Sequence, residues 1–147
     1  MHRAVFVVNC VNSTRDSTSK WLDQHMHRTA LHPCHVCRSA MCFQDIRFDN
    51  DPEFVAFALD AASVHIDHAV EFDGAKRRHK LHLRGVIYLA NYHFTSKIIS
   101  VDGSVWFHDG QTTRAHCTLI GNLNNFTPLQ LVSDGDKRAV MAIYCKK

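Results

Sequence analysis

The sequence predicts an α+β fold that is mostly an antiparallel β-sheet. Short apolar runs alternate with turn signals over residues 51–147, whereas the first 50 residues carry a helical pattern and four of the six cysteines. A chain of 147 residues is one domain or part of one, and this length can bury a core without crosslinks. We expect a single partial domain over 1–147, with a Cys- and His-containing lead segment at 1–50 and the sheet at 51–147.

The lead segment predicts one strand and one helix. Val5–Val8 is an apolar run of strand length, and Ser17–His27 is expected to be helical with Ser17 as its N-cap. The apolar residues of this helix recur at helical spacing and are Trp21, Leu22 and Met26. Pro33 limits the helix because proline has no backbone N–H with which to continue it.

The second half predicts short strands joined by tight turns. The strands expected from the apolar runs are, in chain order, Phe54–Leu59, Val64–Ile66, Leu81–Asn91, Phe94–Val101, Val105–Phe107 and Ala139–Cys145. Asp102 and Gly103, between two apolar runs, are the strongest hairpin signal. Little helix is expected here beyond a turn near Pro128–Leu131.

Composition argues against two classes of partner. The net charge of +3 is mild, and the basic stretch Lys76–Lys80 is interpreted as a solvated loop between strands, so we expect no nucleic-acid partner. No apolar run approaches the roughly 18 residues of a membrane helix, and Met1–Cys10 lacks the features of a signal peptide. We expect an intracellular protein of the cytoplasm or nucleus, without a membrane partner. Its cysteines are then thiols, metal ligands or a nucleophile.

His93 and Asp109 flank the expected hairpin at similar distances from its turn. Residues equidistant from a hairpin turn lie side by side, and a bulge or the strand twist would close the small offset between these two positions. A carboxylate beside the imidazole would fix its tautomer and leave the other ring nitrogen free to act as a base. The same spacing also fits a histidine at a sheet edge near a solvated aspartate, so spacing alone leaves both interpretations open.

Several features follow one another in an order that is informative as a set. They are Cys34-x-x-Cys37, the strand after Asp51-Pro52, the strand with Ile87-Tyr88, then Tyr92-His93-Phe94, Asp102-Gly103, Trp106-x-x-Asp109 and the last strand with Ala142-Ile143-Tyr144. Over residues 30–147 this order resembles the His-bearing, carboxyl-terminal half of the ubiquitin-specific proteases, which are papain-like cysteine proteases.

The resemblance implies a site and a reaction. His93 would be the general base that activates a cysteine, Asp109 would orient it, and Trp106 would pack beneath the pair. The implied activity is thiol-dependent hydrolysis of ubiquitin conjugates, with ubiquitin or a ubiquitin-like protein as partner and no required cofactor. Where this family usually has a glycine before the histidine, the chain has Tyr92.

The sequence does not identify the nucleophile. Cys10 is a weak candidate because Asn9-Cys10-Val11-Asn12-Ser13 faintly resembles part of the family's cysteine motif, and the ordinary interpretation is a buried thiol at a strand end. The helical segment that separates the cysteine motif from the CxxC in the family is missing. We therefore expect the chain to be inactive by itself. It is either a catalytically dead module that binds ubiquitin or one half of an enzyme whose Cys-bearing half is supplied separately.

Cys34 and Cys37 form a CxxC knuckle, the usual half of a structural zinc site, because two thiolates at this spacing can bind one tetrahedral ion. The other ligands would come from Cys42 or from nearby histidines, but the spacing matches no standard zinc finger. A small zinc-containing interaction domain and a metal-free surface knuckle therefore both stay open.

Overall fold

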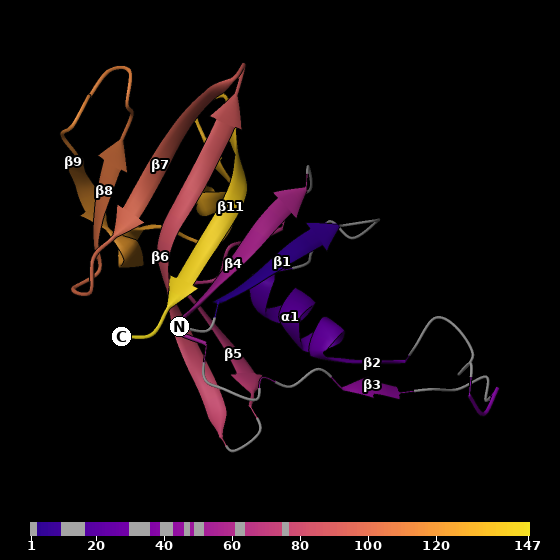
Figure 1. The fold of residues 1–147 in the computed structure, drawn as a ribbon. Helices are drawn as coiled ribbons and strands as arrows, with labels where there is room; N and C mark the ends of the chain where they lie inside the picture. Colours follow the sequence, from indigo (N-terminus) through magenta and orange to yellow (C-terminus); the bar gives the residue numbers. More distant parts are fainter. Residues whose placement is uncertain are drawn as a thin grey trace.

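The computed structural model describes residues 3–9, 17–29, 36–38, 43–45, 48, 52–60, 64–74 and 77–147. These residues fold around one large sheet that is antiparallel except for one pair of strands, with an α-helix beside it (Figure 1). The predicted α+β class with a mostly antiparallel sheet is therefore confirmed. None of the described helices is long and apolar enough to cross a membrane.

Seven strands form the sheet in a continuous order, and two more pair with its members. From one edge to the other the order is β1 (Arg3–Asn9), β4 (Phe54–Asp60), β11 (Lys137–Cys145), β6 (Arg78–Ala90), β7 (His93–Ile99), β8 (Ser104–His108) and β9 (Thr118–Asn122). The strands that pair at the side are β5 with β6 and β10 with β11, over Ala69–Asp73 and Ser133–Asp134. The other elements are α1 (Thr18–Met26), the ribbon of β2 (His27–Thr29) and β3 (Phe43–Asp45), and the 3-10 turns η1 (Leu123–Asn125) and η2 (Gln130–Val132).

One face of the sheet carries the core. Buried residues alternate along the strands, as Leu81 and Leu83 do on β6. The predicted helix is confirmed as α1, and its apolar side packs into the core with Trp21, Leu22 and Met26. Trp21 meets Phe57 edge-on, with 5.9 Å between the ring centroids. The core therefore joins the lead segment to the sheet.

The strands β1 and β4 are parallel, which the sequence pattern does not reveal. A parallel pair requires a long crossover, and the connection between these strands carries α1. The expected strand at Val64–Ile66 is wrong. Among the described residues this segment makes one isolated bridge, between His65 and Ser17, although Val64 and Ile66 are buried.

Two further expectations fail at β6 and β9. Arg78–Lys80 of the basic stretch lies on β6 rather than in a loop, and His79 is buried against the ring of Phe72. The start of that stretch, Lys76, lies outside the described residues. The strand β9 has no counterpart in the sequence-based prediction, because its first three residues are all exposed and give no alternating pattern.

The turn between β7 and β8 confirms the predicted hairpin at Asp102 and Gly103. The carbonyl of Ser100 accepts a hydrogen bond from the Gly103 N–H at 3.0 Å, and Gly103 has a φ of 87°. A turn followed by a left-handed residue is a standard three-residue hairpin loop, and glycine adopts that φ without steric cost.

The turn between β6 and β7 contains only Asn91 and Tyr92, since Ala90 pairs with His93. Both turn residues have left-handed φ angles, 49° for Asn91 and 61° for Tyr92. This is the dihedral pattern of a type I′ turn, whose second position strongly favours glycine. Tyr92 is therefore strained immediately before His93.

Replacing Tyr92 by glycine should stabilise the fold by up to about 1 kcal/mol. The left-handed φ costs an L-residue ~1–2 kcal/mol, and part of the gain is lost because glycine is freer in the unfolded chain. The tyrosine ring is fully exposed and loses no packing. Urea denaturation measures the change in the free energy of unfolding. Tyr92→Ala keeps the Cβ atom as a control, and a glycine variant no more stable than the alanine variant would contradict this strain.

Candidate active site

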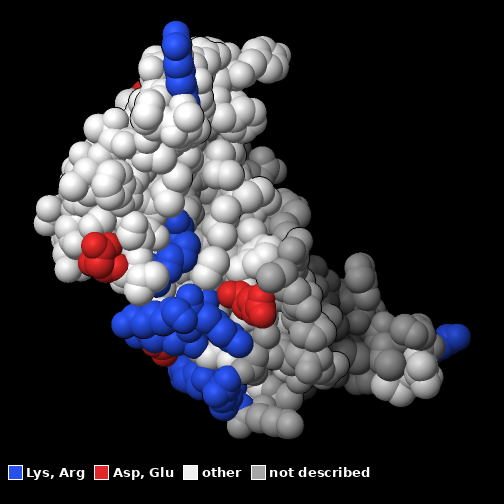
Figure 2. All heavy atoms as spheres, turned by 60° about the vertical axis from the view of Figure 1, so that its left-hand side comes forward, with Lys and Arg blue, Asp and Glu red and all other residues white. Residues whose placement is uncertain are grey.

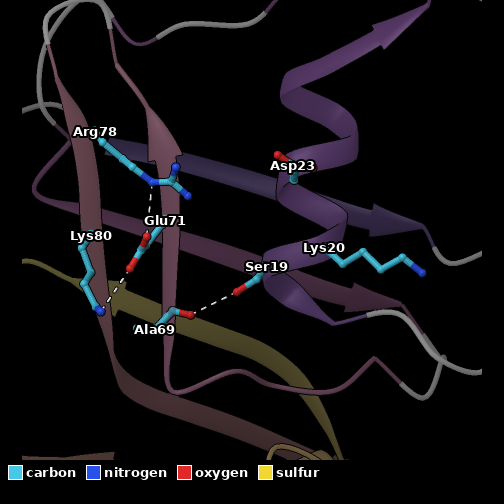
Figure 3. Close-up of a pocket in the computed structure, with 7 residues that line it drawn as sticks. All are labelled: Ser19, Lys20, Asp23, Ala69, Glu71, Arg78 and Lys80. Atoms are coloured by element: carbon cyan, nitrogen blue, oxygen red, sulfur yellow. Dashed lines mark hydrogen bonds and ion pairs between the residues drawn. The ribbon is translucent and has the colours of Figure 1, made fainter.

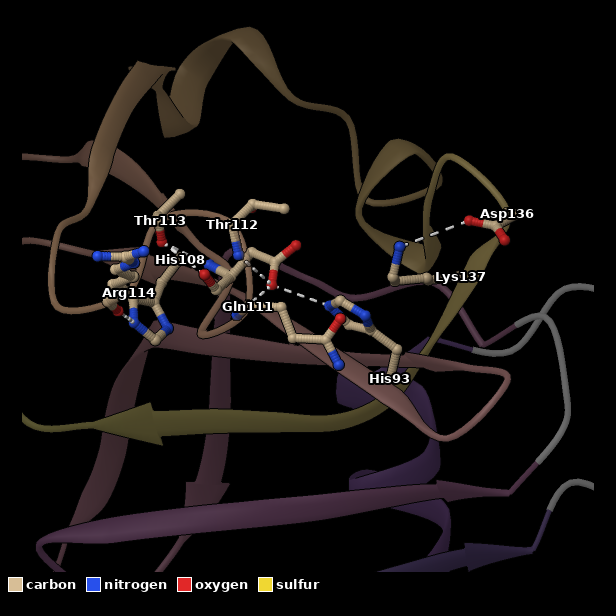
Figure 4. Close-up of polar contacts among 9 residues, drawn as sticks. His93, His108, Gln111, Thr112, Thr113, Arg114, Asp136 and Lys137 are labelled. Atoms are coloured by element: carbon tan, nitrogen blue, oxygen red, sulfur yellow. Dashed lines mark hydrogen bonds and ion pairs between the residues drawn. The ribbon is translucent and has the colours of Figure 1, made fainter.

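His93 and Asp109 meet on the buried face of the β7–β8 hairpin. Because Ser96 pairs with His108, the same register places Thr95 opposite Asp109 and makes His93 its diagonal neighbour. The His93 Nε2 atom lies 2.9 Å from Asp109 Oδ1 (Figure 4). His93 and Asp109 lie at slightly different distances from the hairpin turn. Their diagonal arrangement accounts for this difference, and no bulge between β7 and β8 is needed.

The Asp109 carboxylate is fixed by the loop that follows it. Its Oδ1 atom accepts hydrogen bonds from the backbone N–H groups of Gln111, at 2.9 Å, and Thr112, at 3.4 Å (Figure 4). The Asp109 N–H donates to the Thr113 hydroxyl oxygen at 3.0 Å, and that hydroxyl donates to the Asp109 carbonyl at 2.8 Å. These contacts hold the carboxylate in one place.

The hydrogen bonds also keep Asp109 ionised. Burial alone would raise the pKa of its carboxyl group, but hydrogen bonds from Gln111, Thr112 and His93 outweigh burial and lower the pKa to about 2. A carboxylate can only accept, so His93 donates its Nε2–H and keeps the lone pair of Nδ1. The geometry therefore orients a histidine with Nδ1 available as a base.

A buried lysine supports the same face of the sheet. Lys97 lies two positions beyond Thr95 on β7, and its Nζ atom is 2.7 Å from Asp134 Oδ1 and 4.7 Å from the centre of the Tyr88 ring. The Tyr88 hydroxyl donates to the Leu131 carbonyl at 3.0 Å. Together these contacts fasten η2 and β10 beneath the hairpin. Sequence reasoning missed the ion pair of Lys97 with Asp134. The signal in the sequence was a lysine at the strand position that shares a face with the apolar Ile99.

Trp106 does not lie beneath the pair, so this implied role is wrong. It pairs with Ile98, whereas the inward positions of the two strands are Thr95, Lys97 and Ile99 on β7 and Val105 on β8. Alternation places Trp106 on the opposite face, where its indole N–H donates to the Ser100 hydroxyl at 3.1 Å.

The structure assigns no nucleophile. In the part of the chain that it describes, the hydrogen-bond partner of His93 is Asp109 and not a cysteine thiol. Cys117 is exposed, and burial raises the pKa of the half-buried Cys145 thiol, which disfavours the reactive thiolate. The candidate Cys10 lies outside the described residues, so its distance from His93 is not defined.

Only one of the two predicted zinc ligands lies among the described residues. Cys37 is described and exposed, whereas Cys34 lies outside the described residues. Over residues 3–9, 17–29, 36–38, 43–45, 48, 52–60, 64–74 and 77–147 there is no group of three or more His, Cys, Asp or Glu side chains that could hold a metal ion. Zinc binding at Cys34 and Cys37 stays a prediction.

The fold is similar to solved structures of the SAGA DUB module, which contains the ubiquitin-specific protease Ubp8 together with Sgf11, Sus1 and Sgf73. The module bound to monoubiquitin matches 90% of this chain with a TM-score of 0.59 and 10% identity. The module bound to ubiquitin aldehyde matches 98% with a TM-score of 0.60 and 9% identity. A third structure of the module matches 90% with a TM-score of 0.56 and 11% identity.

These similarities concern the fold, because the sequence identities are very low. This chain spans about a third of the solved chains, with 33%, 35% and 33% of their lengths covered. At the level of sequence, no protein-family model and no curated protein matches the chain. The domain thus shares the fold of a ubiquitin-specific protease structure over its own length.

The Asp109 carboxylate should stabilise the fold at neutral pH and lose this effect in acid. Its folded pKa of about 2 lies below the ordinary value of 3.8, so its contribution is present above the ordinary value and disappears as the pH falls through the folded one. Asp109→Asn should lower the thermal unfolding temperature near neutral pH, and this deficit should shrink between about pH 4 and about pH 2. A deficit that is equal at every pH would contradict the ionised, hydrogen-bonded carboxylate.

Proposed function

We propose that this chain is the His-bearing part of a ubiquitin-specific protease-like domain. It hydrolyses ubiquitin conjugates when a Cys-bearing half is supplied, and it is inactive alone. The contact of 2.9 Å between His93 Nε2 and Asp109 carries the proposal. Its support comes from the order of sequence features and from a fold similar to that of the Ubp8 structures.

The two residues have distinct roles in the proposed reaction. His93 Nδ1 takes the proton of the cysteine thiol, and the thiolate attacks the carbonyl carbon of the isopeptide bond. The imidazolium then returns the proton to the lysine amine as the C–N bond breaks, which leaves ubiquitin bound as a thioester. Water hydrolyses the thioester with His93 again as the base. Asp109 stays ionised throughout and stabilises the imidazolium.

Ubiquitin is the proposed partner, and an intracellular location goes with it. Two of the similar solved structures contain ubiquitin, as monoubiquitin and as ubiquitin aldehyde. In the proposed complex the carboxyl-terminal tail of ubiquitin reaches the His93 end of the hairpin, because its carbonyl carbon is the reacting atom. The strained Asn91–Tyr92 turn lies immediately before His93 and would border this tail.

Titration of the chain with ubiquitin tests the proposal. In NMR spectra the His93 ring resonances should shift as ubiquitin is added, and these shifts should give a dissociation constant in the micromolar range. Ubiquitin that lacks its carboxyl-terminal tail should bind more weakly. A ubiquitin vinyl sulfone probe should leave all six cysteines of the isolated chain unlabelled. Absence of binding, or binding that does not depend on the tail, would contradict the proposal. Labelling of one cysteine would overturn the inactivity of the chain and identify the nucleophile.

A catalytically dead ubiquitin-binding module is the second candidate. It is favoured by the observation that His93 has no thiol partner in the described part of the chain. His93→Ala separates the two candidates when a Cys-bearing half is available. In a pseudoenzyme the substitution leaves both ubiquitin binding and the absence of hydrolysis unchanged, whereas in a split enzyme it abolishes hydrolysis.

A further inference from the structure

The face of the sheet opposite to His93 is apolar and has no cover in the described structure. A row of paired residues crosses it from β11 to β9, in the order Ile143, Gly85, Ile98, Trp106 and Leu119. Ile98 and Leu119 are exposed, at 43% and 55%. We name this surface the open face; it also includes the exposed Phe94. Exposed apolar residues that are contiguous in this way mark interaction sites in soluble proteins.

A hollow of about 240 Å³ lies in the middle of the open face, and its walls include Ile87, Ile98 and Ile143. Gly85 creates this hollow, because it is the one member of the row without a side chain. A Cβ atom on Gly85 would meet Ile143 Cδ1 at 3.8 Å, which is an ordinary contact. The hollow is therefore open to one large apolar side chain from outside.

Basic residues border the open face on β6. Lys80, His82 and Arg84 alternate along the strand on the side opposite to the core. Cys145 pairs with His82, which brings the chain end at Lys147 near this part of β6. Burial lowers the pKa of His82, and the positive charges of Lys147, Arg84 and Lys80 lower it further. Figure 2 shows Lys and Arg side chains gathered below a wide area with few charges.

Part of this basic border is already neutralised. Glu71 contacts Arg78 at 3.2 Å and Lys80 at 3.1 Å (Figure 3). Arg84 differs, since its Nη1 donates to the Ser100 carbonyl at 2.9 Å while its Nη2 is buried and has no hydrogen-bond partner in the described structure. A buried charged donor without an acceptor is costly. Arg84 also lines the hollow, so its guanidinium places a positive charge where the carboxylate of a partner would be attracted.

We propose that the open face binds an acidic amphipathic segment of a partner protein. One large apolar side chain of that segment enters the hollow over Gly85, and its carboxylates face His82, Arg84 and Lys147. Charge complementarity selects this occupant. A second copy of the chain would bring two positive borders together, which is unfavourable. A single-stranded nucleic acid would need aromatic side chains for base stacking, whereas the centre of the face is largely aliphatic. The proposal does not depend on the reaction at His93.

Two short synthetic peptides test the proposal on the full chain. They share the same leucine and phenylalanine residues and differ only in carrying glutamate or lysine between them. Fluorescence of Trp106 reports binding, since the other tryptophan, Trp21, is buried. The glutamate peptide should bind about tenfold more tightly, and high salt should reduce this preference. Equal binding of the lysine peptide, or tighter binding of a single-stranded oligonucleotide, would overturn the proposal.

Variants of the open face locate the binding site. Gly85→Val fills the hollow and should weaken binding of the glutamate peptide about tenfold, and His82→Glu combined with Lys147→Glu should do the same by reversing the border. Leu129→Ser removes a leucine that is 58% exposed elsewhere, and this matched control should bind normally. Thermal unfolding shows whether each variant folds. If Gly85→Val does not fold, Ile98→Ser takes its place, because Ile98 is exposed and its replacement does not disturb the core. Folded open-face variants that bind like the wild type would contradict the assignment.

Discussion

The register of the β7–β8 hairpin determines both of the proposed functional surfaces of this chain. Side chains alternate between the two faces of a strand, so a slip of one residue would exchange every inward and outward position. The turn with Gly103 at a φ of 87° holds the register in which Ile99 pairs with Val105. That register turns His93 towards Asp109 and turns Ile98 towards the opposite face. The sequence of a single turn thus specifies where the polar pair and the apolar row lie.

The two faces of the sheet differ in which groups they bury and which they expose. On the core face, the charged side chains have partners, as Lys97 has Asp134 and His93 has Asp109. On the open face, apolar groups such as Ile98 remain in contact with water. Burial with partners holds His93 and Asp109 in one geometry, and the exposed apolar groups form the surface that we propose binds another molecule. The proposed catalytic pair and the proposed docking surface therefore lie on opposite faces of the β7–β8 hairpin and do not compete for the same side chains.

Local sequence signals predicted much of the fold around the site, and long-range pairing decided the rest. Asp102 and Gly103 predicted the hairpin, and its approximate symmetry predicted that His93 and Asp109 can meet. The role of Trp106 failed because the face on which a residue lies depends on an exact register. The parallel pairing of β1 with β4 and the exposed strand β9 left no periodic pattern to detect. The nucleophile stays open for another reason, since the one candidate that the sequence offered, Cys10, lies outside the described residues.

The tautomer of His93 tests the account most directly, because the base can act only through a free Nδ1. Nitrogen NMR of the histidine side chains at a pH where His93 is neutral distinguishes a proton on Nε2 from one on Nδ1. We expect the proton on Nε2 in the native chain, held by the Asp109 carboxylate at 2.9 Å, and a loss of this preference in Asp109→Asn. A proton on Nδ1, or a tautomer that the substitution leaves unchanged, would contradict the proposed catalytic pair.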